Sequence, residues 1–176
     1  MRAGSGYALL IDPNRNWSGG TDDPKQIDFS RSRVQCLYVG YTDGEKFAYM
    51  IDYLFSLYRK HNYQHRIRVV VDEAHTFTAY GLGDYIEQLM NEGRRFMDVT
   101  LISTRAAMLR TSHGYVALSQ ANRIVFFKCH EVDLRCIQNN VGVEIPDSTV
   151  EHIGKPYHYA VIEGGSVTNY LPVVLR

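Results

Sequence analysis

Short apolar runs alternate along this chain with longer stretches in which apolar residues recur every three or four positions. The clearest apolar run is Val69-Val70-Val71, which is wholly β-branched. Such a run is typical of a strand that is buried on both faces, as in a parallel sheet covered by helices. The strands that the pattern predicts are residues 7–11, 34–39, 69–71, 99–103 and 123–127.

The stretches between these runs predict helices. Apolar residues at helical spacing, from Phe47 to Leu57, predict an amphipathic helix over residues 43–60. Further helices are predicted from Asp84 to about Gly93, over residues 130–140 and over residues 147–153, whereas residues 76–83 are expected to form a loop. Strands that alternate with helices indicate an α/β fold with a mostly parallel sheet, because parallel strands need crossover connections.

The C-terminal part has a different pattern. Residues 157–162 and 167–174 are apolar or alternate, and the turn-forming run Glu163-Gly164-Gly165-Ser166 separates them. Two such runs around a glycine turn predict a β-hairpin. The sequence therefore predicts a C-terminal β-hairpin next to the mostly parallel sheet.

Two carboxylates, Asp72 and Glu73, directly follow the strand 69–71. The carboxyl end of a parallel strand is where open α/β sheets bind ligands. A carboxylate on a rigid strand can hold Mg²⁺, and a second one, one residue later, can orient or deprotonate a water molecule. The alternative is that both residues begin a helix, where carboxylates interact favourably with the helix dipole.

The motifs around these carboxylates occur in a characteristic order. Val69-Val70-Val71-Asp72-Glu73-Ala74-His75 is followed by a helix, by Glu92-Gly93-Arg94-Arg95-Phe96 and by Val99-Thr100-Leu101-Ile102-Ser103-Thr104. This order resembles the HerA/FtsK superfamily of P-loop ATPases. Residues 7–13 and 121–128 resemble two further core strands of that superfamily. The resemblance implies a three-layer, RecA-like ATPase core formed by residues 1–176 as a single domain.

The resemblance also implies a function. Members of the superfamily act as rings, commonly hexamers, on double-stranded DNA, and they couple ATP hydrolysis to DNA translocation or genome packaging. In this chain Asp72 would help to hold Mg²⁺, and Glu73 would position the attacking water. Arg94 is the candidate for an arginine that reaches the ATP of a neighbouring subunit. Alternatively, Arg94 stabilises the C-terminal end of its helix.

Four more residues are expected near the nucleotide. Asp12 and Arg15 follow the first strand, where the alternative is that they cap a loop. Thr104 and Arg105 follow the strand 99–103 and would lie beside Glu73 if the two strands are adjacent. Arg105 stands where the superfamily usually has a glutamine that senses the γ-phosphate. It would either contact phosphate or pair with Glu73 and disable it, and the sequence leaves both open.

One element of the superfamily is missing. The motif Gly-x-x-x-x-Gly-Lys-Ser/Thr occurs nowhere in the chain. A phosphate cradle needs consecutive backbone N–H groups at a helix start and a lysine. We therefore expect weak or absent ATP hydrolysis by this chain, which is either a piece of a motor that begins after its phosphate-binding helix or a degenerate relative.

Two other functions compete with the ATPase. The first is an inactive structural or interaction domain that kept the fold, which the missing lysine and Arg105 favour. The second is a metal-dependent hydrolase or nuclease that uses Asp72, Glu73 and His75. Against the second, no histidine partner stands at H-x-x-x-H spacing from His75.

Composition sets limits on these functions. The 176 residues carry no net charge, so the chain has no general basic footprint for nucleic acid, and DNA contact needs a local patch or a ring. The three cysteines show no C-x-x-C spacing, which favours a reducing, intracellular setting. No signal peptide or long apolar run is visible. We expect a cytoplasmic protein, or a virion-associated one if it is viral, without a membrane segment.

Overall fold

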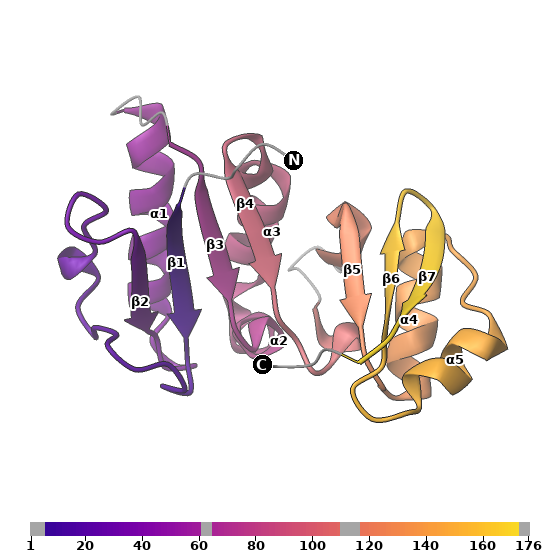
Figure 1. Cartoon of the computed structure of the whole chain (residues 1–176). Coiled ribbons are helices and arrows are strands. Elements are labelled where there is room, and N and C mark those ends of the chain that lie inside the picture. Colours follow the sequence, from indigo (N-terminus) through magenta and orange to yellow (C-terminus); the bar gives the residue numbers. More distant parts are fainter. Residues whose placement is uncertain (1–5, 61–64, 110–116, 173–176) are drawn as a thin grey trace.

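The computed structural model describes residues 6–60, 65–109 and 117–172, which form two β-sheets with helices packed against them (Figure 1). The first sheet is parallel, in the order β2-β1-β3-β4, and the second is antiparallel, in the order β5-β6-β7. The strands are β1 (Tyr7–Asp12), β2 (Val34–Tyr38), β3 (Ile67–Val71), β4 (Met97–Leu101), β5 (Arg123–Phe126), β6 (Tyr159–Glu163) and β7 (Ser166–Tyr170).

Five α-helices connect these strands. They are α1 (Gly44–Arg59), α2 (Ala74–Phe77), α3 (Gly83–Asn91), α4 (Glu131–Val141) and α5 (Asp147–Ile153). Shorter helical turns complete the described part of the chain: η1 (Pro24–Gln26), η2 (Thr78–Leu82), η3 (Gly93–Arg95), η4 (Ala106–Met108) and η5 (Ala117–Gln120). None of the helices in the described residues is both long and apolar enough to cross a membrane.

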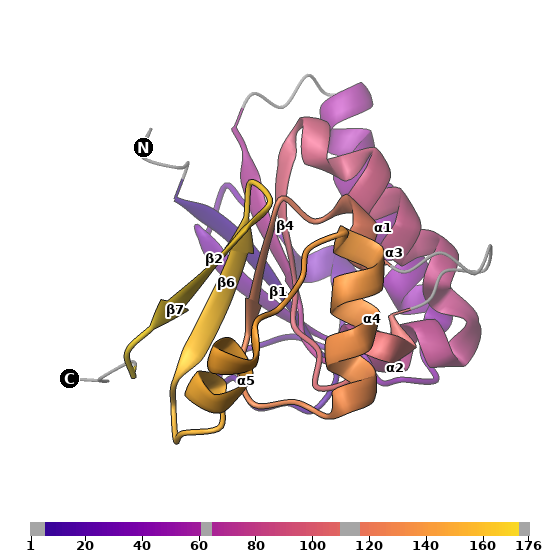
Figure 2. The same ribbon diagram turned by 90° about the vertical axis from the view of Figure 1, so that its right-hand side faces the viewer.

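The parallel sheet buries one of its faces against helices. Leu9 of β1 and Val69 of β3 are fully buried there, and they pack with Phe47 and Leu54 of α1 and Leu89 of α3. The apolar residues of α1 follow helical spacing, so one stripe of the helix meets the sheet. Figure 2 shows α1, α3 and α4 on the same side of the sheets.

The α/β class and the parallel sheet agree with the sequence prediction. The expected three layers require helices on both faces of the sheet. In the described ranges the parallel sheet has a helical layer on one face only.

Residues 76–83 differ from the expected loop, because α2 and η2 form consecutive helical turns there. Phe77 is fully buried and stacks on Phe47 with their ring centroids 4.7 Å apart. The burial of Phe77, together with that of Ala74 and His75, holds this segment in the core of the parallel sheet. Gly81, at φ 83°, interrupts the helical backbone before α3.

The C-terminal β-hairpin is confirmed. Strands β6 and β7 pair with Glu163 opposite Ser166, and both residues of the turn, Gly164 and Gly165, have positive φ. A two-residue hairpin turn of this kind favours glycine at both positions. The hairpin is part of a larger sheet, because β5 pairs with β6.

Each sheet has its own group of buried apolar residues. The second sheet packs Phe126 and Ile162 against Ile137 of α4 and Ile153 of α5. Leu118, in η5, contacts both this group and the core of the parallel sheet. The expectation of a single domain stays a prediction; Leu118 packs against both cores, and Cys136 of α4 also packs against the core of the parallel sheet.

Candidate functional site

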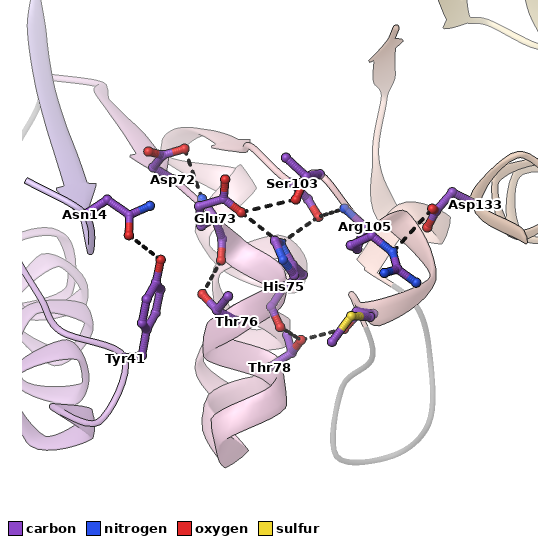
Figure 3. Close-up of polar contacts among 12 residues, drawn as sticks. Asn14, Tyr41, Asp72, Glu73, His75, Thr76, Thr78, Ser103, Arg105 and Asp133 are labelled. Carbon is purple, nitrogen blue, oxygen red and sulfur yellow. Dashed lines mark hydrogen bonds and ion pairs between the residues drawn. The ribbon is translucent and has the colours of Figure 1, made fainter. Parts of the chain in front are cut away.

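Asp72 and Glu73 lie at the carboxyl edge of the parallel sheet, directly after the interior strand β3 (Figure 3). The Asp72 N–H donates to the carbonyl of Ile11 in β1, 3.0 Å away, and the Ile102 N–H donates to that of Val71, 2.9 Å away. The backbone here is therefore fixed from both neighbouring strands. Both carboxylates are partly exposed, so they are accessible to a ligand from the edge of the sheet.

Glu73 has a left-handed backbone, with φ 47° and ψ 40°. The Asp72 carboxylate accepts from the Glu73 N–H at 3.0 Å, and the Glu73 carbonyl accepts from the N–H and hydroxyl of Thr76 at 2.9 and 2.6 Å. Non-glycine residues in this region are strained, and such strain is concentrated at functional sites. The Glu73 side chain does not cap α2, so the simple helix-start alternative does not explain its position.

The Glu73 carboxylate points toward side chains from α2 and from the end of β4. Its Oε2 atom lies 3.3 Å from Nδ1 of His75 and 3.4 Å from the Thr104 hydroxyl. The Ser103 hydroxyl lies 3.1 Å from the same histidine nitrogen. The pairing of β3 with β4 creates this group, because it brings Ser103 and Thr104 next to Glu73.

Serine, histidine and glutamate also form catalytic relays, but the geometry here is different. A relay places the serine and the acid on opposite nitrogens of the imidazole ring. Here Ser103 and Glu73 both approach Nδ1 of His75. His75 is almost fully buried, so this group orients the glutamate and does not activate Ser103 as a nucleophile.

Sequence reasoning missed the role of His75 and Ser103 as partners of Glu73. It considered His75 only as a possible metal ligand and Ser103 only as the end of a strand. The available signal was the strand order: if β3 and β4 are adjacent, the residues that follow them lie side by side at one edge.

Thr104 and Arg105 point to different partners. Thr104 contacts Glu73, as expected for adjacent strands. The Arg105 guanidinium is half-exposed and pairs with Asp133 of α4, with Nε 3.6 Å from Oδ2. The pairing of Arg105 with Glu73, one of the two alternatives from sequence, is not what the structure shows.

Asp133 is a buried residue that the sequence did not mark. It is 1% exposed, and its Oδ1 atom accepts from the Ala107 N–H at 2.8 Å. Among the described residues its Oδ2 atom has no hydrogen-bond partner, and the Arg105 guanidinium lies 3.6 Å from it. Asp133 thus connects α4 to the segment that leaves β4.

Asp12 and Arg15 have structural partners. Asp12 is fully buried at the end of β1, and its carboxylate accepts from the N–H groups of Asn14 and Trp17 at 3.0 and 2.9 Å. Arg15 forms an ion pair with Asp22 and lies over the ring of Tyr38. These contacts are those of a loop cap, which was the alternative to a nucleotide contact.

A tyrosine pair lies at the same edge of the sheet. The Tyr41 hydroxyl donates to Asn14 Oδ1 at 2.5 Å, and the Tyr41 ring stacks on Tyr80 with an interplanar angle of 10°. Tyr80 is 58% exposed. Asn14 follows β1, which pairs with β3, so the tyrosine pair lies at the edge of the sheet that carries Asp72 and Glu73 (Figure 3). No sequence pattern links Tyr41 to Tyr80.

Arg94 lies at the opposite end of the sheet. It belongs to η3, which precedes β4, whereas Glu73 follows β3, and the two strands are parallel. Its side chain is exposed, and its carbonyl accepts from Arg66 at 2.9 Å. Arg94 therefore cannot act on the site of its own chain, and only the site of a neighbouring subunit remains open to it.

Asp72 is the residue that could hold a magnesium ion. Mg²⁺ is commonly bound by one or two carboxylates together with water and substrate phosphate, which a partly exposed carboxylate on a strand end fits. Asp72, Glu73 and His75 do not form a protein-only site: the described ranges contain no group of three His, Cys, Asp or Glu side chains arranged to hold a metal ion.

A shallow pocket lies elsewhere, around the C-terminal end of α5. Its volume is about 290 Å³, and Phe127, Lys128, Lys155 and Tyr157 are among its lining residues. None of the candidate site residues lines it. This pocket is therefore separate from the Asp72–Glu73 edge, where the polar groups converge.

Comparison of the sequence with protein-family models gives no match, and comparison with curated protein sequences gives none either.

Proposed function

We propose that this chain carries the acidic half of an ATP-hydrolysing site, in a motor of the HerA/FtsK type. The observation that carries the proposal is the position of Asp72 and Glu73 at the carboxyl edge of a parallel sheet, with Thr104 of the neighbouring strand on Glu73. This is the edge at which α/β sheets bind ligands.

The residues have separate roles in this proposal. Asp72 would hold Mg²⁺, which neutralises charge on the phosphates of ATP when bound. Glu73, oriented by His75 and Thr104, accepts a hydrogen bond from the attacking water and takes up its proton. Arg105 is half-exposed, and a phosphate group would compete with Asp133 for it.

Double-stranded DNA and a hexameric ring are the proposed partners, and the family resemblance is what supports them. Because the net charge is zero, DNA binding would depend on a local basic patch or on the ring, and not on a general basic surface. Arg94, exposed at the opposite end of the sheet, would serve the site of the next subunit.

The test measures binding of Mg²⁺-ATP by calorimetry together with ATP turnover. It compares this chain with the polypeptide produced from the complete natural reading frame. This chain alone is expected to show weak or no turnover, because its sequence has no phosphate-binding motif. The complete polypeptide is expected to hydrolyse ATP, and Glu73→Gln should lower kcat at least 100-fold while ATP binding is retained.

Glu151→Gln is the matched control, because Glu151 is an exposed carboxylate on α5, outside the site. Failure of the complete polypeptide to bind Mg²⁺-ATP, or turnover that Glu73→Gln leaves unchanged, contradicts the proposal. Turnover by this chain alone that disappears in Glu73→Gln would support the proposed ATPase function. It would contradict the expectation that this chain cannot bind the phosphates of ATP.

An inactive structural domain is the second candidate. The missing phosphate-binding motif and the engagement of Arg105 by Asp133 favour it. It predicts that the complete polypeptide folds and assembles but neither binds nor hydrolyses ATP.

A further inference from the structure

Strand β7 is an outer strand of the antiparallel sheet. Among the described strands it pairs only with β6, in one unbroken register that runs from Tyr159 opposite Tyr170 to Glu163 opposite Ser166. Because no residue is skipped, the strand is regular along its whole length. We call the side of β7 that faces away from β6 the β7 edge. Figure 2 shows β7 at the side of the molecule opposite α1 and α3.

The outer strand of the other sheet, β2, has a partly covered edge. The Thr21 N–H donates to the carbonyl of Cys36 at 3.0 Å, and the Tyr38 N–H donates to the carbonyl of Thr21 at 2.9 Å. Within residues 6–60, 65–109 and 117–172, no segment forms backbone hydrogen bonds of this kind to the β7 edge. The two outer strands therefore differ, and the backbone of β7 is the accessible one.

The β7 edge has none of the features that commonly protect an outer strand. Proteins protect such strands with charged side chains, proline, bulges or a covering segment. The strand reads Ser166-Val167-Thr168-Asn169-Tyr170, and all of these residues except Val167 are exposed. His152 of α5 fixes the end of the strand, because its Nε2 atom lies 2.7 Å from the carbonyl oxygen of Tyr170. The β7 edge is thus a fixed and exposed template for another strand.

The hairpin turn determines which backbone groups point outward. Gly164 and Gly165 form a two-residue turn, in which the residue after the turn directs its N–H to the residue before it. Ser166 therefore directs its backbone groups to β6. Since successive residues of a strand alternate, Val167 and Asn169 direct their N–H and C=O groups to the β7 edge.

We propose that the β7 edge pairs with the β7 edge of a second copy of this chain, antiparallel and with a two-fold axis at Thr168. In this register Val167 exchanges backbone hydrogen bonds with Asn169 of the second copy, and the two Thr168 residues lie opposite each other without such bonds. The two antiparallel sheets then form one continuous sheet. The inference goes beyond the proposed function and does not depend on nucleotide binding.

The sequence of β7 makes this pairing self-complementary. Opposing threonines are a favourable cross-strand pair, and like charges, which would be unfavourable, do not occur in the strand. Tyr170, which is 39% exposed, would face Ser166 of the second copy, whose small side chain leaves room for the ring. The chain has no net charge, so two copies repel each other little.

The contact is expected to be weak. Stable interfaces bury at least about 1,200 Å² in total, and the edges of two short strands would bury less. We therefore expect a dimer that forms only as the concentration rises. The contact is also isologous, whereas a ring needs heterologous contacts, so a hexameric ring would use other surfaces of the chain.

Sedimentation equilibrium of this chain, from micromolar to millimolar concentration, tests the association. The mass should rise from 20.2 kDa toward twice that value. Thr168→Lys places two lysines opposite each other at the axis and should weaken the association at least about 10-fold. Thr100→Lys is the matched control, because Thr100 is also an exposed strand residue but belongs to β4, and it should leave the association unchanged.

Oxidative cross-linking tests the register. Thr168→Cys places two thiols opposite each other at the axis, within the separation that a disulfide spans, so mild oxidation should give a covalent dimer. Ser166→Cys is the matched control on the same face of the same strand. Its two thiols would be about 13 Å apart along the paired strands, so it should cross-link no more than the unmodified chain with its three cysteines.

Any of three results would overturn the proposal: a mass that stays at 20.2 kDa, an association that Thr168→Lys leaves unchanged, or cross-linking of Ser166→Cys as efficient as that of Thr168→Cys. Slow hydrogen exchange of the Val167 and Asn169 amides in a monomer would also overturn it, since another segment of the chain would then cover the β7 edge. A dimer with this register in a protein that does not bind ATP would support the β7 contact and contradict the proposed function. The two failures are thus distinguishable.

Discussion

Glu73 combines a strained backbone with a carboxylate held at the edge of the sheet. Its φ of 47° lies in the left-handed region, which glycine adopts without steric cost. The contacts of Asp72 and Thr76 hold it there, and the contacts of His75 and Thr104 orient its side chain. The fold thus stabilises a conformation that places this one carboxylate away from its own helix.

The strain at Glu73 leads to a stability prediction. Glu73→Gly should be more stable than Glu73→Ala by about 1 kcal/mol, because both lose the carboxylate and only alanine retains the left-handed strain. Urea unfolding monitored by circular dichroism measures the difference.

The control reverses the order. At Glu151, inside the regular helix α5, glycine should be less stable than alanine by about 1 kcal/mol. Equal stabilities of the two Glu73 variants would show that the segment relaxes and that no strain is stored there.

Sequence reasoning located the carboxylates but not their surroundings. Asp72 and Glu73 follow an apolar run, and this pattern is local, so it was visible without a structure. The contact of Thr104 with Glu73 was predicted only on the condition that β3 and β4 are adjacent, which the structure satisfies. Arg105 pairs with Asp133, and no local pattern links two residues from different halves of the chain.

At the scale of elements, strands and long helices were predicted well and short turns were not. Helix α1 was expected over residues 43–60 and spans Gly44–Arg59, since its apolar spacing is long and regular. Residues 76–83, which form most of α2 and η2, were expected to be a loop because two glycines interrupt the local pattern. Burial of Phe77 against Phe47, a tertiary contact, decides their conformation.

Asp133 tests the connection between α4 and η4. Asp133→Ala removes the acceptor of the partly buried Ala107 N–H and should lower the free energy of unfolding by about 1–3 kcal/mol. Chemical denaturation at neutral pH measures the loss.

Asp147→Ala is the matched control for Asp133→Ala. Asp147 also stands in the first turn of a helix, but it is exposed, so its removal should cost less than about 1 kcal/mol. Similar losses of stability for the two variants would contradict the conclusion that buried Asp133 stabilises the connection between α4 and η4.

At the scale of the whole molecule, stability should fall at alkaline pH. Burial, with a smaller contribution from Asp12, raises the pKa of the Cys36 thiol to about 11, and burial with Asp133 raises that of Cys129 to about 11. Unfolded thiols lose their protons near pH 9, so between about pH 9 and 11 the unfolded state binds fewer protons than the folded state. Stability is therefore complete below pH 9 and declines as the pH rises through this window.

Unfolding midpoints in urea from pH 8 to 11 measure this decline. The double variant Cys36→Ala, Cys129→Ala should show a shallower decline over the same window, whatever its stability at pH 8. An unchanged slope would show that other groups cause the alkaline loss.

Leu118 tests whether the two sheets unfold together. It is the partly buried residue that packs against both cores, so Leu118→Ala should lower the free energy of unfolding by about 2 kcal/mol. Trp17 is the only tryptophan, and its backbone bonds to Asp12 and Tyr38 tie it to the parallel sheet. Its fluorescence follows that sheet, whereas far-UV circular dichroism follows the whole chain.

In the unmodified chain the two signals should change at the same urea concentration, since the sheets share a core through Leu118. In Leu118→Ala both midpoints should fall together. Val132→Ala, at a position of α4 that is 63% exposed, should leave both midpoints nearly unchanged. If the Trp17 midpoint stayed fixed while the circular dichroism became biphasic, the two sheets would be independent units. The expectation of a single domain over residues 1–176 would then be wrong, because each core would be stable without the contacts that Leu118 provides.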